Sequence, residues 1–175
     1  MKHRPKHLLI ELPTADEIDD LAVTAPRFEV RKLEFDHSDR KADLNYSPCK
    51  GQIVLVVRGE KGTALVRAKG TTDWSLPSGR IGPTEEVAKA AKRVAKEQCG
   101  LMLKSAELAA MYDVVWHFSD ISIKRLHIVY AGVTDDTECC PDDADKKEAA
   151  FFVEIPKGVE TDQIFVHALA DCSAK

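Results

Sequence analysis

The sequence WSLPSGRIGPTEEVAKAAKRVAKEQCGL, residues 74–101, carries the strongest structural signals of the chain. An extended segment ends at Pro77, and Ser78, Gly79 and Gly82 then predict a loop whose backbone can approach a ligand. From about Glu85 to Cys99 apolar residues recur with the helical period. Gly100 stands where a left-handed residue is expected to end that helix. The stretch therefore predicts a strand end, a glycine loop and a capped helix.

The same stretch resembles the Nudix box, the signature of the Nudix hydrolase family. Counting from Gly79, Glu85 follows after five residues and Arg93 after seven more. The positions in register with the box are Gly79, Glu85, Arg93, Glu97, Gly100 and Leu101. The lead-in from Trp74 to Gly79, Trp-x-Leu-Pro-x-Gly, is also similar to the family. The box is nevertheless degenerate, because Val94 and Gln98 stand where the family has glutamates and Ala95 where it has a bulky aliphatic residue.

The resemblance implies an α/β fold, an α/β/α sandwich with a mixed β-sheet, and covers about residues 50–157. We expect three parts: residues 1–48 as an N-terminal extension packed on the domain, residues 49–157 as the Nudix-like domain, and residues 158–175 as a C-terminal helix of the same domain. The length of 175 residues suits one domain.

Patterns outside the box predict the remaining elements. A short strand or arm is expected around Leu8 to Leu12, and a capping box at Thr14 and Glu17 predicts a helix over about 15–24. Alternation predicts an exposed strand at Phe28 to Phe35, before a polar linker at 36–48. The later predictions are strands at 53–57, 63–68, 108–118, 122–133 and 149–155, an acidic loop at 134–147 and a helix at about 162–172. The strands at 108–118 and 122–133 are expected to pair antiparallel.

Composition narrows the classes of protein. The formal net charge of −4 argues against a protein that binds long nucleic acid. It does not argue against a small phosphorylated ligand held in a local cationic pocket. The five cysteines are odd in number and form no Cys-x-x-Cys, which favours reduced thiols and a cytoplasmic location. No apolar run approaches the ~20 residues that span a membrane, so no membrane partner is expected.

In the family, Mg²⁺ or Mn²⁺ bound by helical carboxylates neutralises a diphosphate and activates water. The resemblance implies Gly79, through its carbonyl, Glu97 and Gln98 as metal ligands. It implies Glu97, Arg93 and Glu85 as catalytic residues, the last two orienting the loop and helix. With Val94 and Gln98 substituted, we expect weak metal binding. The candidates to replace the missing ligands are Asp113, Glu138, Asp142, Asp143 and Asp145.

Substrate contacts are expected from Arg67 and Arg80, which could meet phosphates, and from Trp74, which could stack on a base. Each basic residue alone is equally typical of a solvated surface, and Tyr112, Trp116 and Phe118 are more typical of a sheet core than of a base site. Glu85, Lys89, Arg93 and Glu97 also have the spacing of an ordinary ladder of ion pairs on a helix surface.

The leading hypothesis is therefore a metal-dependent hydrolase of a nucleoside-diphosphate-linked substrate, a nucleotide pyrophosphate, with weak or altered activity. The alternative is a catalytically inactive Nudix-like module that binds a nucleotide or a protein partner. A third interpretation is a homodimer formed through residues 1–48 and 158–175, with a vestigial pocket.

Overall fold

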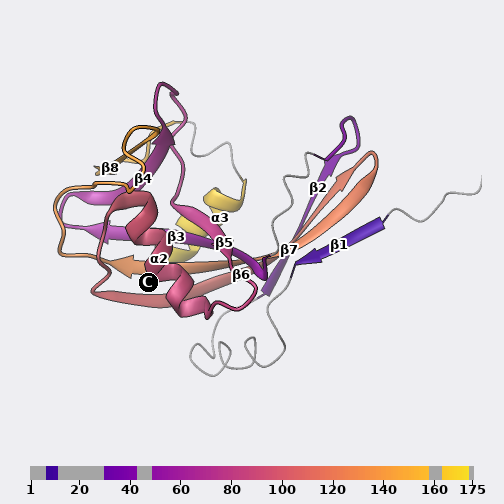
Figure 1. Cartoon of the computed structure of the whole chain (residues 1–175), viewed down its shortest axis with the longest axis horizontal. Helices are drawn as coiled ribbons and strands as arrows, with labels where there is room; N and C mark the ends of the chain where they lie inside the picture. Colours follow the sequence, from indigo (N-terminus) through magenta and orange to yellow (C-terminus); the bar gives the residue numbers. More distant parts are fainter. Residues whose placement is uncertain (1–6, 12–29, 43–48, 158–162, 174–175) are drawn as a thin grey trace, which may run out of the picture.

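A computed structural model describes residues 7–11, 30–42, 49–157 and 163–173. Figure 1 shows a single twisted sheet with α2 on one face and α3 on the other. The strands are β1 (His7–Glu11), β2 (Val30–His37), β3 (Gly51–Gly59), β4 (Gly62–Ala68), β5 (Ser78–Ile81), β6 (Ser105–Phe118), β7 (Ile121–Val133) and β8 (Lys147–Phe152). The helices are α2 (Val87–Cys99) and α3 (Gln163–Ser173). The helix predicted at 15–24 lies outside the described residues.

The sheet is mixed, in the order β2-β6-β7-β3-β4-β8. β6 and β7 pair antiparallel, as predicted, whereas β3 runs parallel to β7. β5 pairs with β3, and β1 with β7. The mixed α/β/α sandwich expected from the sequence is therefore confirmed.

Alternation along the central strands builds two hydrophobic cores. Ile53, Leu55 and Val57 of β3 pack against the apolar face of α2, whereas Val54 and Val56 belong to the core that contains α3. The apolar stripe of α2 explains why its position was predictable, since its buried residues recur at helical spacing. Gly100 ends this helix as predicted, with φ of 67° and its N–H bonded to the carbonyl of Lys96.

Two expectations need correction. Residues 78–81 do not form an open loop: they form β5, which pairs antiparallel with Gly51 to Val54 of β3. Glu85 lies before the helix, because α2 begins at Val87. The predicted strands and the C-terminal helix occur, within the described residues, with ends displaced by a few residues, as is usual for sequence-based boundaries.

The outer half of the β6–β7 hairpin projects from the body of the molecule (Figure 1). There β2 pairs with residues 111–118 of β6, and β1 with residues 121–125 of β7. We call these four paired segments the arm. In the part of the chain that the structure describes, no helix is long and apolar enough to cross a membrane.

Candidate functional site

Arg93 links Glu85, in the turn before α2, to Glu97 on the helix. Its guanidinium donates to both carboxylate oxygens of Glu85, at 2.7 and 2.9 Å, and to Oε2 of Glu97 at 2.9 Å. Nη2 also donates to the carbonyl of Arg80 at 2.7 Å. Glu85 in turn accepts the N–H of Gly82 at 3.1 Å. These five residues, here called the Arg93 network, hold β5 and the turn after it against the helix.

Electrostatics favour the charged forms in this network. The hydrogen bonds from Arg93 lower the pKa of Glu85, against partial burial that would raise it, and the Gly82 N–H and the charge of Lys50 act in the same direction as Arg93. The hydrogen bond to Glu85 raises the pKa of Arg93. The alternative of a ladder of ion pairs on the helix is present only in part, because Arg93 pairs with Glu97 but Lys89 pairs with Glu86 and not with Glu85.

Val94 packs in the core beneath α2 and gives the box no carboxylate at this position. Its side chain is 1% exposed and belongs to the core beneath α2. A Cβ placed on Gly79 would lie 2.8 Å from Cγ2 of Val94, so the helix and β5 are in direct contact at this point. An isopropyl group can neither bind a cation nor accept a proton. The position that the family gives to a carboxylate is therefore filled by apolar contact.

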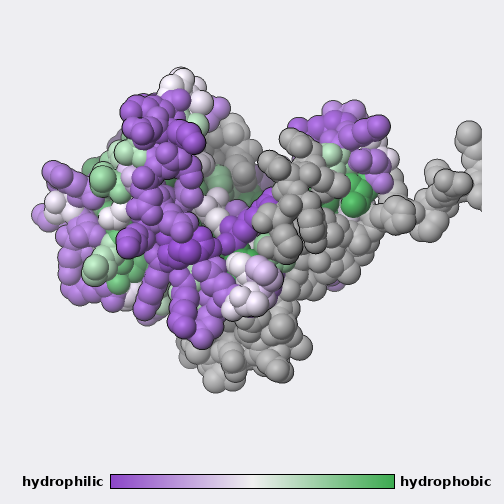
Figure 2. All heavy atoms as spheres, viewed as in Figure 1, coloured by the Kyte–Doolittle hydropathy of each residue, from purple (hydrophilic) through white to green (hydrophobic). Residues whose placement is uncertain are grey.

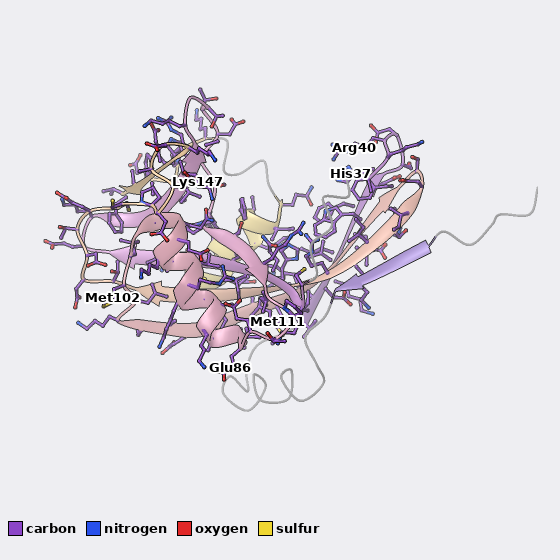
Figure 3. All side chains as sticks on the ribbon, viewed as in Figure 1. His37, Arg40, Glu86, Met102, Met111 and Lys147 are labelled. Carbon is purple, nitrogen blue, oxygen red and sulfur yellow. The ribbon has the colours of Figure 1, made fainter. Side chains whose placement is uncertain are left out.

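The other implied ligands are engaged or remote from one another. Glu97, 43% exposed, is bonded to Arg93, and the amide oxygen of Gln98 accepts from Nζ of Lys147 at 3.3 Å. Figure 3 places Lys147 and Glu86 at opposite ends of α2. Asp113 forms an ion pair with Lys124 in the β6–β7 hairpin, at 3.2 Å.

The acidic loop approaches α2 through its backbone. The N–H of Asp142 donates to the carbonyl of Glu97 at 3.0 Å, and that of Cys140 to the carbonyl of Cys99 at 2.8 Å. The loop's acidic side chains, Glu138, Asp142, Asp143 and Asp145, are exposed. Among the residues that the structure describes, no three His, Cys, Asp or Glu side chains are grouped so that they could hold a metal ion. Of the implied ligands Gly79, Glu97 and Gln98, only Glu97 supplies a carboxylate, whereas Mg²⁺ usually takes one or two carboxylates together with phosphate oxygens and waters.

The substrate candidates lie on the other face of the sheet. Arg67 is two residues from Leu65, which packs in the core on the α3 side, and its guanidinium lies 4.5 Å from the centroid of the Trp74 ring. Nε of Arg67 also bonds Glu148 at 2.6 Å. Trp74 packs edge-on against Phe152, with ring centroids 4.7 Å apart. The Trp74 ring is thus already in contact with both Arg67 and Phe152.

Arg80 is separated from the Arg93 network by strand alternation. Its neighbour Ile81 lies in the core beneath α2, so the Arg80 side chain points to the α3 side while its carbonyl serves Arg93. The predicted site residues are therefore divided: Gly79, Glu85, Arg93 and Glu97 meet on the α2 side, and Arg67, Trp74 and Arg80 do not join them.

Comparison with solved structures identifies this arrangement. The pyrophosphohydrolase BsRppH of Bacillus subtilis (E68A mutant) superposes with a TM-score of 0.53 and 15% identity, over 76% of this chain and 87% of the other. A MutT NUDIX hydrolase from Burkholderia pseudomallei gives 0.54 and 20%, over 69% and 95%. The chain has a Nudix-like fold. The NUDIX domain of Shewanella oneidensis NrtR, in a complex with ADP ribose, gives 0.52 and 12%, over 75% and 94%. No protein-family model and no curated protein sequence matches this chain.

Two residues near the Nudix box escaped the sequence reasoning. Lys50 is 9% exposed and its charge acts on Glu85, yet it precedes β3 and is far from the box in sequence. Lys147, which binds Gln98, begins β8. No spacing rule relates these lysines to α2, because strand pairing alone brings them there. In the β5–β3 register Gly51 pairs with Ile81, and the Ile81 carbonyl accepts the N–H of Lys50.

Proposed function

We propose that the chain is a Nudix-like module that binds a nucleoside-diphosphate-type ligand and does not hydrolyse it efficiently. The observation that carries the proposal is the contact between Val94 and Gly79, which leaves an apolar group where the family has a carboxylate. The pairing of Glu97 with Arg93 and of Gln98 with Lys147 supports it, since both side chains of the box already have partners in the protein. The loop–helix junction itself is retained by the Arg93 network.

The ligand class is taken from the resemblance and from one structural neighbour. The NUDIX domain of NrtR is bound to ADP ribose, a nucleotide linked through a diphosphate. In this chain the charge of Lys50 acts on Glu85, next to the turn after β5, and cationic side chains can bind diphosphate oxygens without a metal. Binding that is independent of divalent cations is therefore the expected behaviour.

A second candidate is a weak hydrolase that depends on a divalent metal. Of the structural neighbours, BsRppH is a pyrophosphohydrolase and the Burkholderia pseudomallei protein is a MutT NUDIX hydrolase. The observation in its favour is the hydrogen bond from Asp142 to the Glu97 carbonyl, which lays the acidic loop against the end of α2. A carboxylate recruited from this loop would act together with Glu97. In this case activity would be low, because one box carboxylate is Val and another is Gln.

Binding and turnover separate the two candidates. The purified chain is titrated calorimetrically with ADP ribose, a dinucleoside polyphosphate and a nucleoside triphosphate, once with EDTA and once with Mn²⁺. We expect saturable binding of at least one ligand that is the same in both buffers. Absence of binding, or binding only with Mn²⁺, would contradict the proposal. Hydrolysis is followed on the same ligands with Mg²⁺ and Mn²⁺.

The matched variants are Glu97→Gln and Glu86→Gln. Both remove one carboxylate from the region of α2, but Glu86 contacts only Lys89 among the described ion pairs and is outside the Arg93 network. Turnover that is lost in Glu97→Gln and kept in Glu86→Gln would establish the hydrolase and reject the silent module. No turnover in the native chain, with binding retained in both variants, is the result we expect.

A restoration experiment gives a readout other than activity. Val94→Glu places a carboxylate at a site that is 1% exposed. If the charge has no partner there, the free energy of unfolding falls by about 2–5 kcal/mol. Combined with Gln98→Glu, it recreates the carboxylates of the box. If Mn²⁺ raises the melting temperature of the double variant and not that of the native chain, the native site lacks only these oxygens.

A further inference from the structure

Lys147 brings a positive charge to a position of the box that has lost its carboxylate. It begins β8, where Ala149 and Phe151 pack against the core beneath α2, so strand alternation turns Lys147 to the same side of the sheet. Its Nζ donates to the amide oxygen of Gln98 at 3.3 Å. Figure 3 labels Lys147 at the end of α2 away from Glu86, and Figure 2 shows hydrophilic surface in this region. An ammonium group thus lies against the oxygen that the resemblance assigns to a metal.

The carboxylates next to this pair in the sequence are bonded to other cations. Glu148, which follows Lys147 on β8, forms an ion pair with Arg67 at 2.6 Å. Glu97, which precedes the bonded glutamine on α2, forms its ion pair with Arg93 at 2.9 Å. None of the ion pairs between described residues includes Lys147. Its charge is therefore left without a carboxylate partner in this part of the chain.

The single partner of the ammonium leaves its charge uncompensated. The amide oxygen of Gln98 is neutral, and it accepts only one of the three N–H groups that a lysine ammonium carries. Lys147 is half-buried, so its side chain is partly removed from water and still reaches the surface. A charge in such a position is stabilised by an opposite charge nearby. The group therefore has both the charge and the donors to bind an anion.

We propose that the Lys147 ammonium binds a phosphate oxygen of the ligand directly, in the role that the family gives to a divalent cation. The inference rests on the proposed function and adds to it the group that recognises the diphosphate. A lysine ammonium is a compact point charge and a usual partner of phosphate groups in proteins. Because this cation is part of the chain, the contact with the ligand needs no metal. The preferred ligands are therefore metal-free compounds that carry a diphosphate.

The test uses the full chain and calorimetric titration in EDTA, with ADP ribose and with inorganic pyrophosphate as probes. Lys147→Gln removes the charge and keeps a polar side chain, and it should weaken binding of both probes roughly ten- to hundredfold, the effect of one charge-assisted hydrogen bond. Lys146→Gln is the matched control. It removes the same charge from the adjacent residue, whose side chain is 81% exposed and pairs with Asp143 at 3.9 Å. Its affinity should stay close to that of the native chain.

Two further variants separate the charge from the packing of Lys147. Lys147→Arg keeps the charge and should retain most of the affinity that Lys147→Gln loses. Gln98→Glu places a carboxylate where Lys147 already bonds an oxygen, so it should neutralise the ammonium and weaken metal-free binding. Native affinity in Gln98→Glu would contradict the proposal, because an ammonium paired with a carboxylate no longer attracts phosphate.

Salt dependence and stability provide readouts that a purely structural role would not reproduce. The affinity of Lys147→Gln should depend less on salt concentration than that of Lys146→Gln, since one screened attraction is gone. Circular dichroism and a thermal melt establish that each variant is folded. An affinity lost in Lys147→Gln and not restored by Lys147→Arg, with an unchanged dependence on salt, would mean that Lys147 only supports the fold.

The native chain separates failure of this inference from failure of the proposed function. If it binds neither ADP ribose nor pyrophosphate in EDTA, both are overturned. If it binds them, and Lys147→Gln binds as tightly as Lys146→Gln, the proposed function stands and the role of Lys147 is rejected. Binding in the native chain that is selectively weakened in Lys147→Gln and Gln98→Glu is the result we expect.

Discussion

Cγ2 of Val94 lies 2.8 Å from the point that a Cβ on Gly79 would occupy. A methyl group at residue 79 therefore requires the helix or β5 to shift. We expect Gly79→Ala to lower the free energy of unfolding by roughly 1–3 kcal/mol, as overpacking in cores does. Val94→Ala should cost a similar amount, roughly 1–3 kcal/mol, through the cavity that it leaves.

The double variant makes this prediction specific. Because Val94→Ala removes the atoms that the new methyl group would meet, Gly79→Ala/Val94→Ala should be more stable than the sum of the single changes implies, by about 0.5–3 kcal/mol. Urea denaturation of all four proteins gives the coupling. Simple additivity would show that the two residues are not in contact in solution.

Acid should weaken the Arg93 network. Glu85 has a lowered pKa, chiefly because Arg93 bonds its carboxylate. It therefore contributes stability above its unfolded pKa of about 4.3, and this contribution is lost as pH falls through the lower folded value. Glu85→Gln should reduce the dependence of stability on pH below about 4.5. Glu86→Gln, which alters an exposed carboxylate beside it, should not, and equal profiles for the two variants would contradict the assignment.

His127 should also make the fold sensitive to acid, over a higher pH range. Burial, with the charge of Arg125 as a further cause, lowers the pKa of its imidazole to about 3. Below a pH of about 6.5 His127 takes up a proton in the unfolded chain but not in the folded chain. The free energy of unfolding should therefore fall by about 1.4 kcal/mol for each pH unit between the unfolded pKa of about 6.5 and the folded pKa of about 3. In His127→Phe the urea midpoint should therefore change less between pH 6.5 and 4 than in the native chain, and an unchanged dependence on pH would contradict the assignment.

Gly100 should tolerate no side chain. Its φ is 67°, and a Cβ there would lie 1.9 Å from the carbonyl oxygen of Cys140. Gly70 has φ of 83° with nothing within 4 Å of its Cβ position. Gly70→Ala should therefore cost only the left-handed backbone energy, about 1–2 kcal/mol. Gly100→Ala should lower the melting temperature clearly more than Gly70→Ala. Equal decreases would mean that the backbone at Cys140 moves away from the new methyl group at little cost.

The elements that could be predicted from the sequence are those whose signals lie within the element itself. α2 was predictable because its apolar period and Gly100 are both local. β5 was not, since Ser78 to Ile81 carry no alternation and form a strand only because β3 offers free backbone groups. Arg67 and Trp74 were expected at the box but lie on the α3 side, because a strand's facing depends on register. The division at residues 48 and 157 remains a prediction.

The position of β1 has a consequence for how the chain is made. His7 pairs with Ile121, so the first strand leaves the ribosome long before its partner does. At a synthesis rate of ~5–20 residues per second, the backbone N–H and C=O groups of β1 lack their hydrogen-bond partners in β7 for several seconds. The pairing of β1 with β7 must therefore come late in the assembly of the sheet, after residues 121–125 have been made.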